Sequence, residues 1–141
     1  MNHFELHPCI EQDSVLVGHF ELCQVRLQND CQYPWLILVP KRHAITEIYQ
    51  LDKSDQQQLL EESSYLAEQM VNIYRADKIN IAAIGNMVPQ LHVHHIARYR
   101  IDKAWPAPVW GKFESIAYSA KRLAEQLELL SKRLNFKFQE S

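Results

Sequence analysis

Residues 90–98 read Gln-Leu-His-Val-His-His-Ile-Ala-Arg, and this run holds three of the seven histidines of the chain. Its apolar and β-branched residues predict a β-strand. Alternate side chains leave a strand on the same face, roughly 6.5–7 Å apart. We therefore expect Gln90, His92 and His94 to line one face and His95 to lie on the other. Imidazole serves as a nucleophile, an acid or base, or a metal ligand near neutral pH, so the shared face predicts a site.

Other apolar runs predict the strands that accompany this one. Residues 35–39, which end at Pro40, form a continuous apolar run typical of a central strand covered on both faces. Residues 78–84 predict a strand joined to residues 90–98 by the short connection 85–89, so the two should be antiparallel neighbours. Residues 15–17 and 22–27 predict two more strands, with a break at Gly18 and His19.

The clearest helix is predicted over residues 54–74. Ser54 with Gln57 three positions later is a capping-box pattern, and Leu59, Leu66 and Met70 recur at helical spacing. Residues 45–49 predict a shorter helix, and residues 114–134 a C-terminal helix with an apolar seam that packs on the domain or on a second copy.

A segment rich in tryptophan and proline lies before the C-terminal helix. We expect Trp105 and Trp110 to pack against the body or a partner, with base stacking or a lid role as the alternative.

Length and composition favour a single domain over residues 1–141, in which the Trp/Pro segment and C-terminal helix occupy 101–141. The fold class is α+β: an antiparallel sheet of about five strands, with one long helix packed on it and a C-terminal helix. A net charge of −2 does not favour broad nucleic-acid binding. No run approaches the roughly 20 apolar residues of a membrane helix.

Three cysteines without a C-x-x-C pair predict free thiols in a reducing compartment. The first eight residues lack the basic start and apolar run of a signal peptide. Both observations predict a cytoplasmic protein.

The histidine run resembles the signature of the histidine-triad (HIT) family, His-φ-His-φ-His-φ-φ, in which φ is apolar. Alignment on the tail Ile96-Ala97-Arg98 gives the third triad position to His94, the second to His92 and the first to Gln90. His95 then occupies an apolar position, which is a second departure from the pattern. Residues 35–40 resemble the inner strand of the family, and the bacterial diadenosine-polyphosphate-hydrolase-like branch looks closest.

The resemblance covers most of residues 14–100 and implies a HIT-like fold and a homodimer without a required cofactor. Such a protein would hydrolyse a purine (di)nucleoside polyphosphate or a nucleoside phosphoramidate at the α-phosphate. His92 would attack the phosphorus and form a nucleotidyl-histidine. His94 would donate to a non-bridging oxygen or help to protonate the leaving group. Gln90 would donate from its amide, which cannot shuttle a proton.

Two asparagines also match family positions. Asn29 is similar to the residue that binds the ribose, and Asn86, after Gly85, is similar to the residue whose amide reaches the phosphate. Both also suit plain turns, because Asn favours such positions.

Two other interpretations stay open. The missing first histidine suits a nucleotide-binding module with little turnover. His-x-His is also a metal-ligand spacing to which His95 would add a third nitrogen, although we expect His95 to be a packed or interface histidine and no metal site to form. Arg98 is expected to be a structural ion-pair partner.

Overall fold

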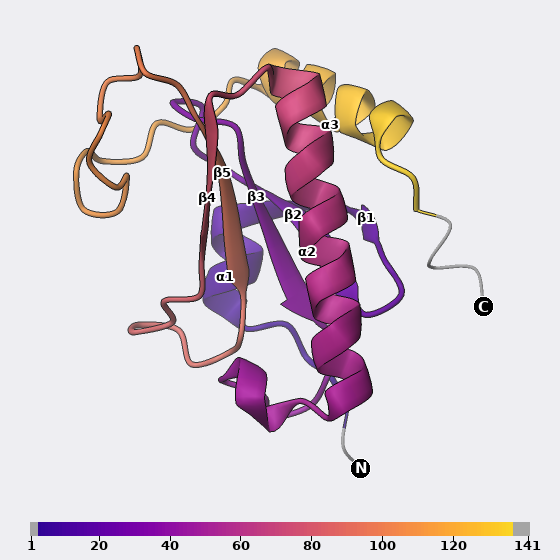
Figure 1. Cartoon of the computed structure of the whole chain (residues 1–141). Coiled ribbons are helices and arrows are strands. Elements are labelled where there is room, and N and C mark those ends of the chain that lie inside the picture. Colours follow the sequence, from indigo (N-terminus) through magenta and orange to yellow (C-terminus); the bar gives the residue numbers. More distant parts are fainter. Residues whose placement is uncertain (1–2, 137–141) are drawn as a thin grey trace.

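The computed structural model describes residues 3–136 and contains a five-stranded antiparallel sheet of order β1-β2-β3-β5-β4 (Figure 1). The predicted α+β class is confirmed. The strands are β1 (Ser14–His19), β2 (Cys23–Gln28), β3 (Trp35–Pro40), β4 (Lys78–Ala82) and β5 (Val93–Arg98); the helices are α1 (Pro8–Asp13), the 3-10 turn η1 (Ile48–Gln50), α2 (Lys53–Tyr74) and α3 (Ala120–Arg133). No helix of the described chain is long and apolar enough to cross a membrane, and all three cysteines are free.

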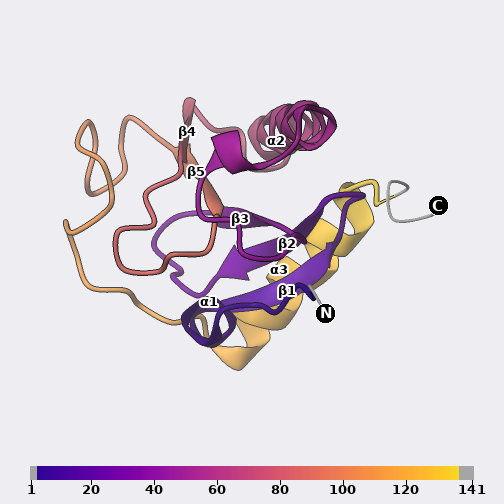
Figure 2. The same cartoon turned by 90° about the horizontal axis from the view of Figure 1, so that it is seen from below.

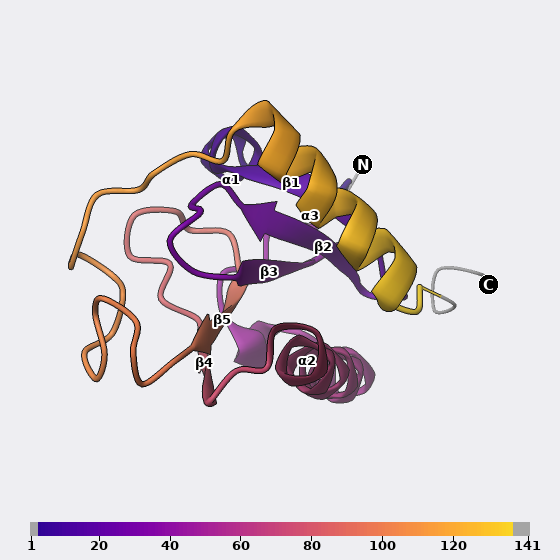
Figure 3. The same cartoon turned by 90° about the horizontal axis from the view of Figure 1, so that it is seen from above.

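The two faces of the sheet are covered by different parts of the chain. α2 lies along β5 and β4, and α3 lies along β1 (Figures 2 and 3). Their apolar residues share one core with the residues of β2, β3 and β5 that point the same way. Ile10 of α1, with Ala104 and Val109 from the irregular segment after β5, packs against the opposite face. That segment, which runs from β5 to α3, loops out to the left in all three views.

β3 and β5 form the buried centre of the sheet. Every residue of both strands is buried, as the apolar run of β3 predicts. β5, however, begins at Val93, so the prediction of a strand from residue 90 is wrong. The reason is the loss of partners: the last pairs are Val93 with Leu38 and His94 with Ala82. Before them, the Leu91 N–H donates to the Ile45 carbonyl outside the sheet.

β1 continues through the break that was predicted at Gly18 and His19. A bulge between Leu16 and Gly18 shifts its register against β2, and pairing resumes up to His19. Gly18 is not a turn residue. A Cβ atom there would lie 2.8 Å from the Phe136 ring, so the glycine makes room for a residue that follows α3.

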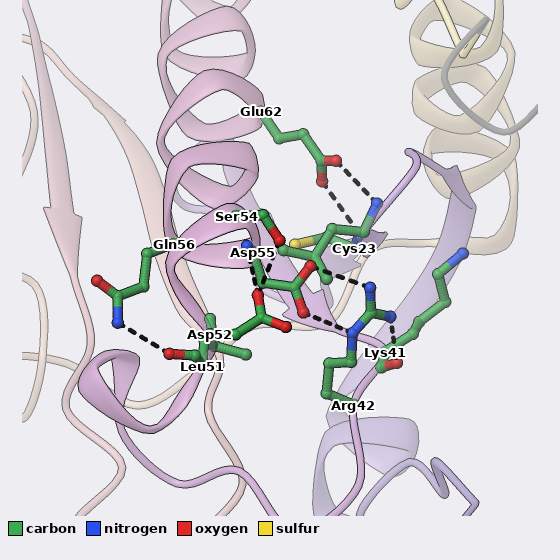
Figure 4. A network of polar contacts seen from close by, with 10 residues as sticks. Cys23, Lys41, Arg42, Leu51, Asp52, Ser54, Asp55, Gln56 and Glu62 are labelled. Carbon is green, nitrogen blue, oxygen red and sulfur yellow. Dashed lines mark hydrogen bonds and ion pairs between the residues drawn. The ribbon is translucent and has the colours of Figure 1, made fainter.

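α2 begins at Lys53, and its N-cap lies two residues before the predicted one. Asp52, not Ser54, is the N-cap; its carboxylate accepts from the Asp55 N–H at 2.9 Å and from the Ser54 hydroxyl. The Asp55 carboxylate pairs with Arg42, which follows β3 (Figure 4). Two turns further along, the fully buried Glu62 accepts from the Leu22 and Cys23 N–H groups, which ties α2 to the start of β2.

α3 begins at Ala120, six residues after the predicted start at Glu114, with Ser119 as its N-cap. The preceding residues are extended because other parts of the chain use their main-chain groups. The Ile116 carbonyl accepts from the Cys31 N–H, and the Tyr118 N–H donates to Asn29 Oδ1. The predicted helix over 45–49 is reduced to the single turn η1.

Candidate functional site

The histidines of residues 92–95 are divided between the two faces of the sheet. His92, just before β5, and His94, within it, face the side of α1. Their rings lie 4.9 Å apart, centroid to centroid. His95 faces α2, fully buried, with Nε2 2.7 Å from the Ser63 hydroxyl. The structure therefore confirms the prediction that His95 lies on the opposite face from His92 and His94.

The tautomer of His92 follows from its partner. Nδ1 lies 2.7 Å from the Gln90 carbonyl oxygen, which can only accept a hydrogen bond. Nδ1 must therefore carry the proton, and the lone pair of the neutral ring is on Nε2. A neutral imidazole with this lone pair is the nucleophilic form.

His94 has the opposite tautomer. The indole Nε1 of Trp35 lies 2.9 Å from His94 Nδ1, and an indole N–H can only donate. Nδ1 is therefore the acceptor, and Nε2 of the neutral ring carries the proton. Burial, with the positive charges that His92 and His95 would carry, lowers the pKa of His94 to about 3. His94 thus stays a neutral hydrogen-bond donor over the whole physiological range.

Two compartments meet at this histidine pair. The larger is a cavity of about 320 Å³, and its wall is mainly aromatic and apolar: Gln28, Trp35, Ile84, Gly85, Asn86, Met87, Val88, His92, His94 and Trp110. The smaller, of about 130 Å³, is lined by Cys9, Ile10, Asp13, Gln28, Ile37, Val88, His92 and His94. Gln28, Val88 and the two histidines belong to both walls, so a bound molecule that spans the compartments must pass the histidine pair.

Trp110 closes one side of the larger compartment. Its ring meets those of His94 and Trp35 edge to face, at 5.4 and 5.9 Å between centroids. Trp110 therefore packs on the sheet, as expected, and it also lines the cavity. Trp105 instead lies beside the Arg98 guanidinium, 5.7 Å from it.

The Gln90 side chain lies outside the walls of these two compartments and is held by the N-terminal arm. Its Oε1 accepts from the His7 N–H at 2.8 Å, and its Nε2 donates to the Glu5 carbonyl at 2.8 Å. Both ends of the amide thus hold the N-terminal arm, residues 3–7. Gln90 contributes to the site through its main-chain carbonyl, which orients His92.

The other predicted residues are divided. Asn86 lines the larger compartment. Asn29 is in neither wall, and its side-chain oxygen accepts from the Tyr118 N–H; its neighbour Gln28 lines both compartments instead.

Arg98 is a structural ion-pair partner, as expected. It is 1% exposed and binds both carboxylate oxygens of Asp102, at 2.9 and 3.0 Å. Burial opposes ionisation of Asp102, yet Arg98 and three main-chain N–H groups lower its pKa to about 2.

Sequence reasoning missed Trp35, Gln28 and Cys9 as wall residues. The apolar run 35–39 predicts a buried strand but not which residue meets a histidine. The only signal was alternation, which gives Trp35, Ile37 and Val39 one face.

The arrangement does not bring three imidazoles together for a metal. His95 lies on the far side of the sheet from His92 and His94, bonded to Ser63. Within residues 3–136, no group of three or more His, Cys, Asp or Glu side chains is placed to hold a metal ion.

Known proteins resemble this chain in sequence and in fold. A family model described as the HIT domain matches residues 10–101. A histidine triad protein from Marinobacter aquaeolei has 48% identity and a TM-score of 0.92, covering 94% of this chain and 96% of that one. The histidine triad protein from Bradyrhizobium japonicum has 41% identity and a TM-score of 0.91, covering 94% and 99%.

A third solved structure, of a histidine triad protein from Sinorhizobium meliloti, has 40% identity and a TM-score of 0.90, covering 93% and 97% of the two chains. No curated protein matches the sequence. The family match over most of the chain and three structures at 40% identity or more agree with the fold and with the histidine motif. The chain belongs to the HIT-domain family of histidine-triad proteins.

Proposed function

We propose that this protein is a nucleotide hydrolase that cleaves at the α-phosphate of a purine nucleotide through a nucleotidyl-histidine on His92. HIT-family members are generally nucleotide hydrolases or transferases. The observation that carries the proposal is the pair of opposite tautomers on one cavity wall. His92 offers a lone pair, and His94 offers an N–H; the centroids of the two rings lie 4.9 Å apart.

In the first step, His92 Nε2 attacks the α-phosphorus, and the bond from phosphorus to the leaving group breaks as the P–N bond forms. His92 becomes a cation with Nδ1–H, whose charge the Gln90 carbonyl stabilises. His94 Nε2–H donates to a non-bridging oxygen as its charge grows. Proton transfer from His94 would leave a buried imidazolate, so the leaving group takes its proton from solvent.

In the second step, water attacks the phosphorus and the P–N bond breaks. The electron pair returns to His92 Nε2, and the proton lost by water passes to solvent. The product is a nucleoside monophosphate. Dividing the displacement into two steps replaces one difficult barrier with two lower ones. Neither step requires a metal ion or cofactor in this proposal, and activity should survive chelation with EDTA.

The two compartments offer separate places for the two halves of the substrate. Ile10 and Ile37 of the smaller compartment suit the apolar face of a purine, and Gln28 at the junction suits the ribose hydroxyls. The ribose role predicted for Asn29 passes to Gln28 here, because Tyr118 already uses Asn29. Asn86 keeps its predicted role as a donor to the phosphate.

The leaving group would occupy the larger compartment. Trp110, Met87 and Ile84 give it an aromatic and apolar wall, which suits an uncharged group better than a polyphosphate chain. Among the two expected substrate classes, dinucleoside polyphosphates and nucleoside phosphoramidates, the wall favours phosphoramidates. We also propose that the protein is a cytoplasmic homodimer. Its mass can be measured by sedimentation velocity.

A substrate panel tests the proposal. Diadenosine polyphosphates and adenosine phosphoramidates of aromatic amines would be compared for the parent protein and His92→Ala. We expect the parent to hydrolyse the phosphoramidates faster, and His92→Ala to lose on the order of 10³-fold or more in kcat/KM. Equal activity of the two proteins on every substrate would show that the mechanism is wrong. Tight nucleotide binding without turnover in the parent would favour a binding module.

A further inference from the structure

Trp35 is the partner of His94 across the strands at the centre of the sheet. Trp35 pairs with Ile96 and Ile37 with His94, so Trp35 and His94 are diagonal neighbours on one face. The indole is 7% exposed, and its N–H donates to His94 Nδ1 at 2.9 Å. This hydrogen bond lies inside the cavity wall, where water competes with it little.

We propose that Trp35 is a positioning residue whose indole N–H holds His94 in the Nε2–H tautomer, so that His94 presents a donor to the phosphate. The effect of this hydrogen bond on the rate of hydrolysis rests on the proposed function, whereas its effect on the tautomer of His94 does not. The titratable groups that act on His94 are His92 from the same segment and His95 from the opposite face. Neither of them makes a hydrogen bond with His94 that could choose between its two nitrogens.

Removal of the indole N–H would act on both ring nitrogens. Nδ1 would become a buried acceptor without its donor, which is costly, so the preference for the Nε2–H tautomer would be lost and the proton could occupy Nδ1 instead. Nε2 would then present a lone pair to the phosphate oxygens and repel them. Catalysis should therefore fall more than binding, because the lost interaction strengthens as charge develops.

Trp110 provides a matched control on the same imidazole. Its ring lies 5.4 Å from that of His94, as close as Trp35 at 5.6 Å, and it also meets His94 edge to face. Its Nε1, however, is buried without a hydrogen-bond partner among residues 3–136. Trp110→Phe therefore also replaces an indole in contact with the His94 ring, but it removes no hydrogen bond to His94.

The experiment combines nuclear magnetic resonance and kinetics. Long-range proton–nitrogen correlation on protein labelled with ¹⁵N-histidine reports which His94 nitrogen carries the proton. We expect the Nε2–H form in the parent and in Trp110→Phe, and a mixture in Trp35→Phe. With a phosphoramidate substrate, kcat of Trp35→Phe should fall about 10-fold or more while KM changes less than about 2-fold. Trp110→Phe should mainly raise KM, because Trp110 lines the leaving-group compartment.

A second measurement needs no variant. In the unaltered protein, a scalar coupling between the Trp35 indole nitrogen and His94 Nδ1 should appear across the hydrogen bond, and its absence would overturn the proposal. An unchanged tautomer in Trp35→Phe, or an equal change in Trp110→Phe, would also overturn it. If the tautomer changes as expected but the parent hydrolyses no nucleotide, the proposed function fails and the role of Trp35 in positioning His94 stands.

Discussion

At the level of single residues, His92 and His94 carry complementary chemistry because their Nδ1 atoms meet different partners. A main-chain carbonyl accepts from one, and an indole donates to the other. In the proposed mechanism, the two rings are thus arranged as a nucleophile and a neutral donor before any substrate binds. Such preorganisation lowers the cost of reaching a charged transition state, because the donor does not have to reorient.

Gln90 acts at this scale through two separate groups. Its carbonyl orients His92, and its side-chain amide holds Glu5 and His7 of the N-terminal arm, which leads into α1. We predict that Gln90→Ala keeps the first interaction and loses the second. The His7 amide should then exchange its hydrogen faster, and KM should rise several-fold with a smaller change in kcat, because α1 forms part of the cavity wall.

Gln12→Ala, which alters an exposed glutamine of α1 itself, is the matched control and should change neither quantity. A large fall in kcat for Gln90→Ala, with His7 exchange and KM unchanged, would contradict this role. That result would instead assign the Gln90 amide to the chemistry.

The sequence predicts which two histidines share a face but not their tautomers. Alternation separates His95 from His92 and His94 without any knowledge of the fold. The partners that decide the tautomers could not be predicted. Trp35 is 59 residues away from His94, and the Gln90 carbonyl points at His92 only because the chain leaves the sheet before Val93.

At the level of elements, α2 is attached to the centre of the sheet by polar bonds as well as by its apolar stripe. Ser63 meets His95 of β5, and Glu62 binds the first N–H groups of β2. His95 is fully buried, and burial lowers its pKa to about 4, although its bond to the Val93 carbonyl acts in the opposite direction. The folded protein therefore needs a neutral His95.

This burial predicts a loss of stability in acid. An unfolded histidine takes up a proton near pH 6.5, whereas folded His95 does so only near pH 4. Its contribution to stability is thus complete above pH 6.5 and is lost as the pH falls toward 4. Over this window, the free energy of unfolding of the parent should fall by about 1.4 kcal/mol per pH unit more steeply than that of His95→Gln.

Urea unfolding of the two proteins at several pH values between 7 and 4 measures the difference. The amide of His95→Gln can still accept from Ser63 but does not titrate, so the other histidines cancel in the comparison. Parallel curves for the parent and the variant would show that His95 titrates in the folded protein as it does in the unfolded chain.

Element boundaries were predictable where local signals act alone. β3 and the body of α2 follow from their apolar patterns. The starts of α2, β5 and α3 did not, because each depends on groups elsewhere in the chain. Asp52 caps α2 ahead of the Ser54 pattern, β5 begins only where β3 and β4 can pair with it, and contacts with residues 29–32 keep 114–119 extended.

At the level of the whole molecule, the site exists because α2 and α3 cover the same face of the sheet. The opposite face is left to shorter pieces: the N-terminal arm, α1, the connection 83–92 and the segment between β5 and α3 (Figures 1 and 2). Three of these pieces, α1, the connection and the segment with Trp110, supply cavity walls around His92 and His94. No single stretch of sequence contains this cavity, which is why its histidines and Asn86 could be predicted but most of its wall could not.

The central claim is a covalent intermediate on His92, and a rapid-quench experiment tests it most directly. Protein would be mixed with an adenosine phosphoramidate, stopped within one turnover in alkaline denaturant to preserve the P–N bond, and analysed by intact mass and peptide mapping. His95→Gln, which alters the adjacent histidine on the opposite face, and His92→Ala are the controls. We predict one added nucleoside monophosphate on His92 in the parent and in His95→Gln, and none in His92→Ala. Hydrolysis that proceeds with no adduct on His92 at any time would contradict the account.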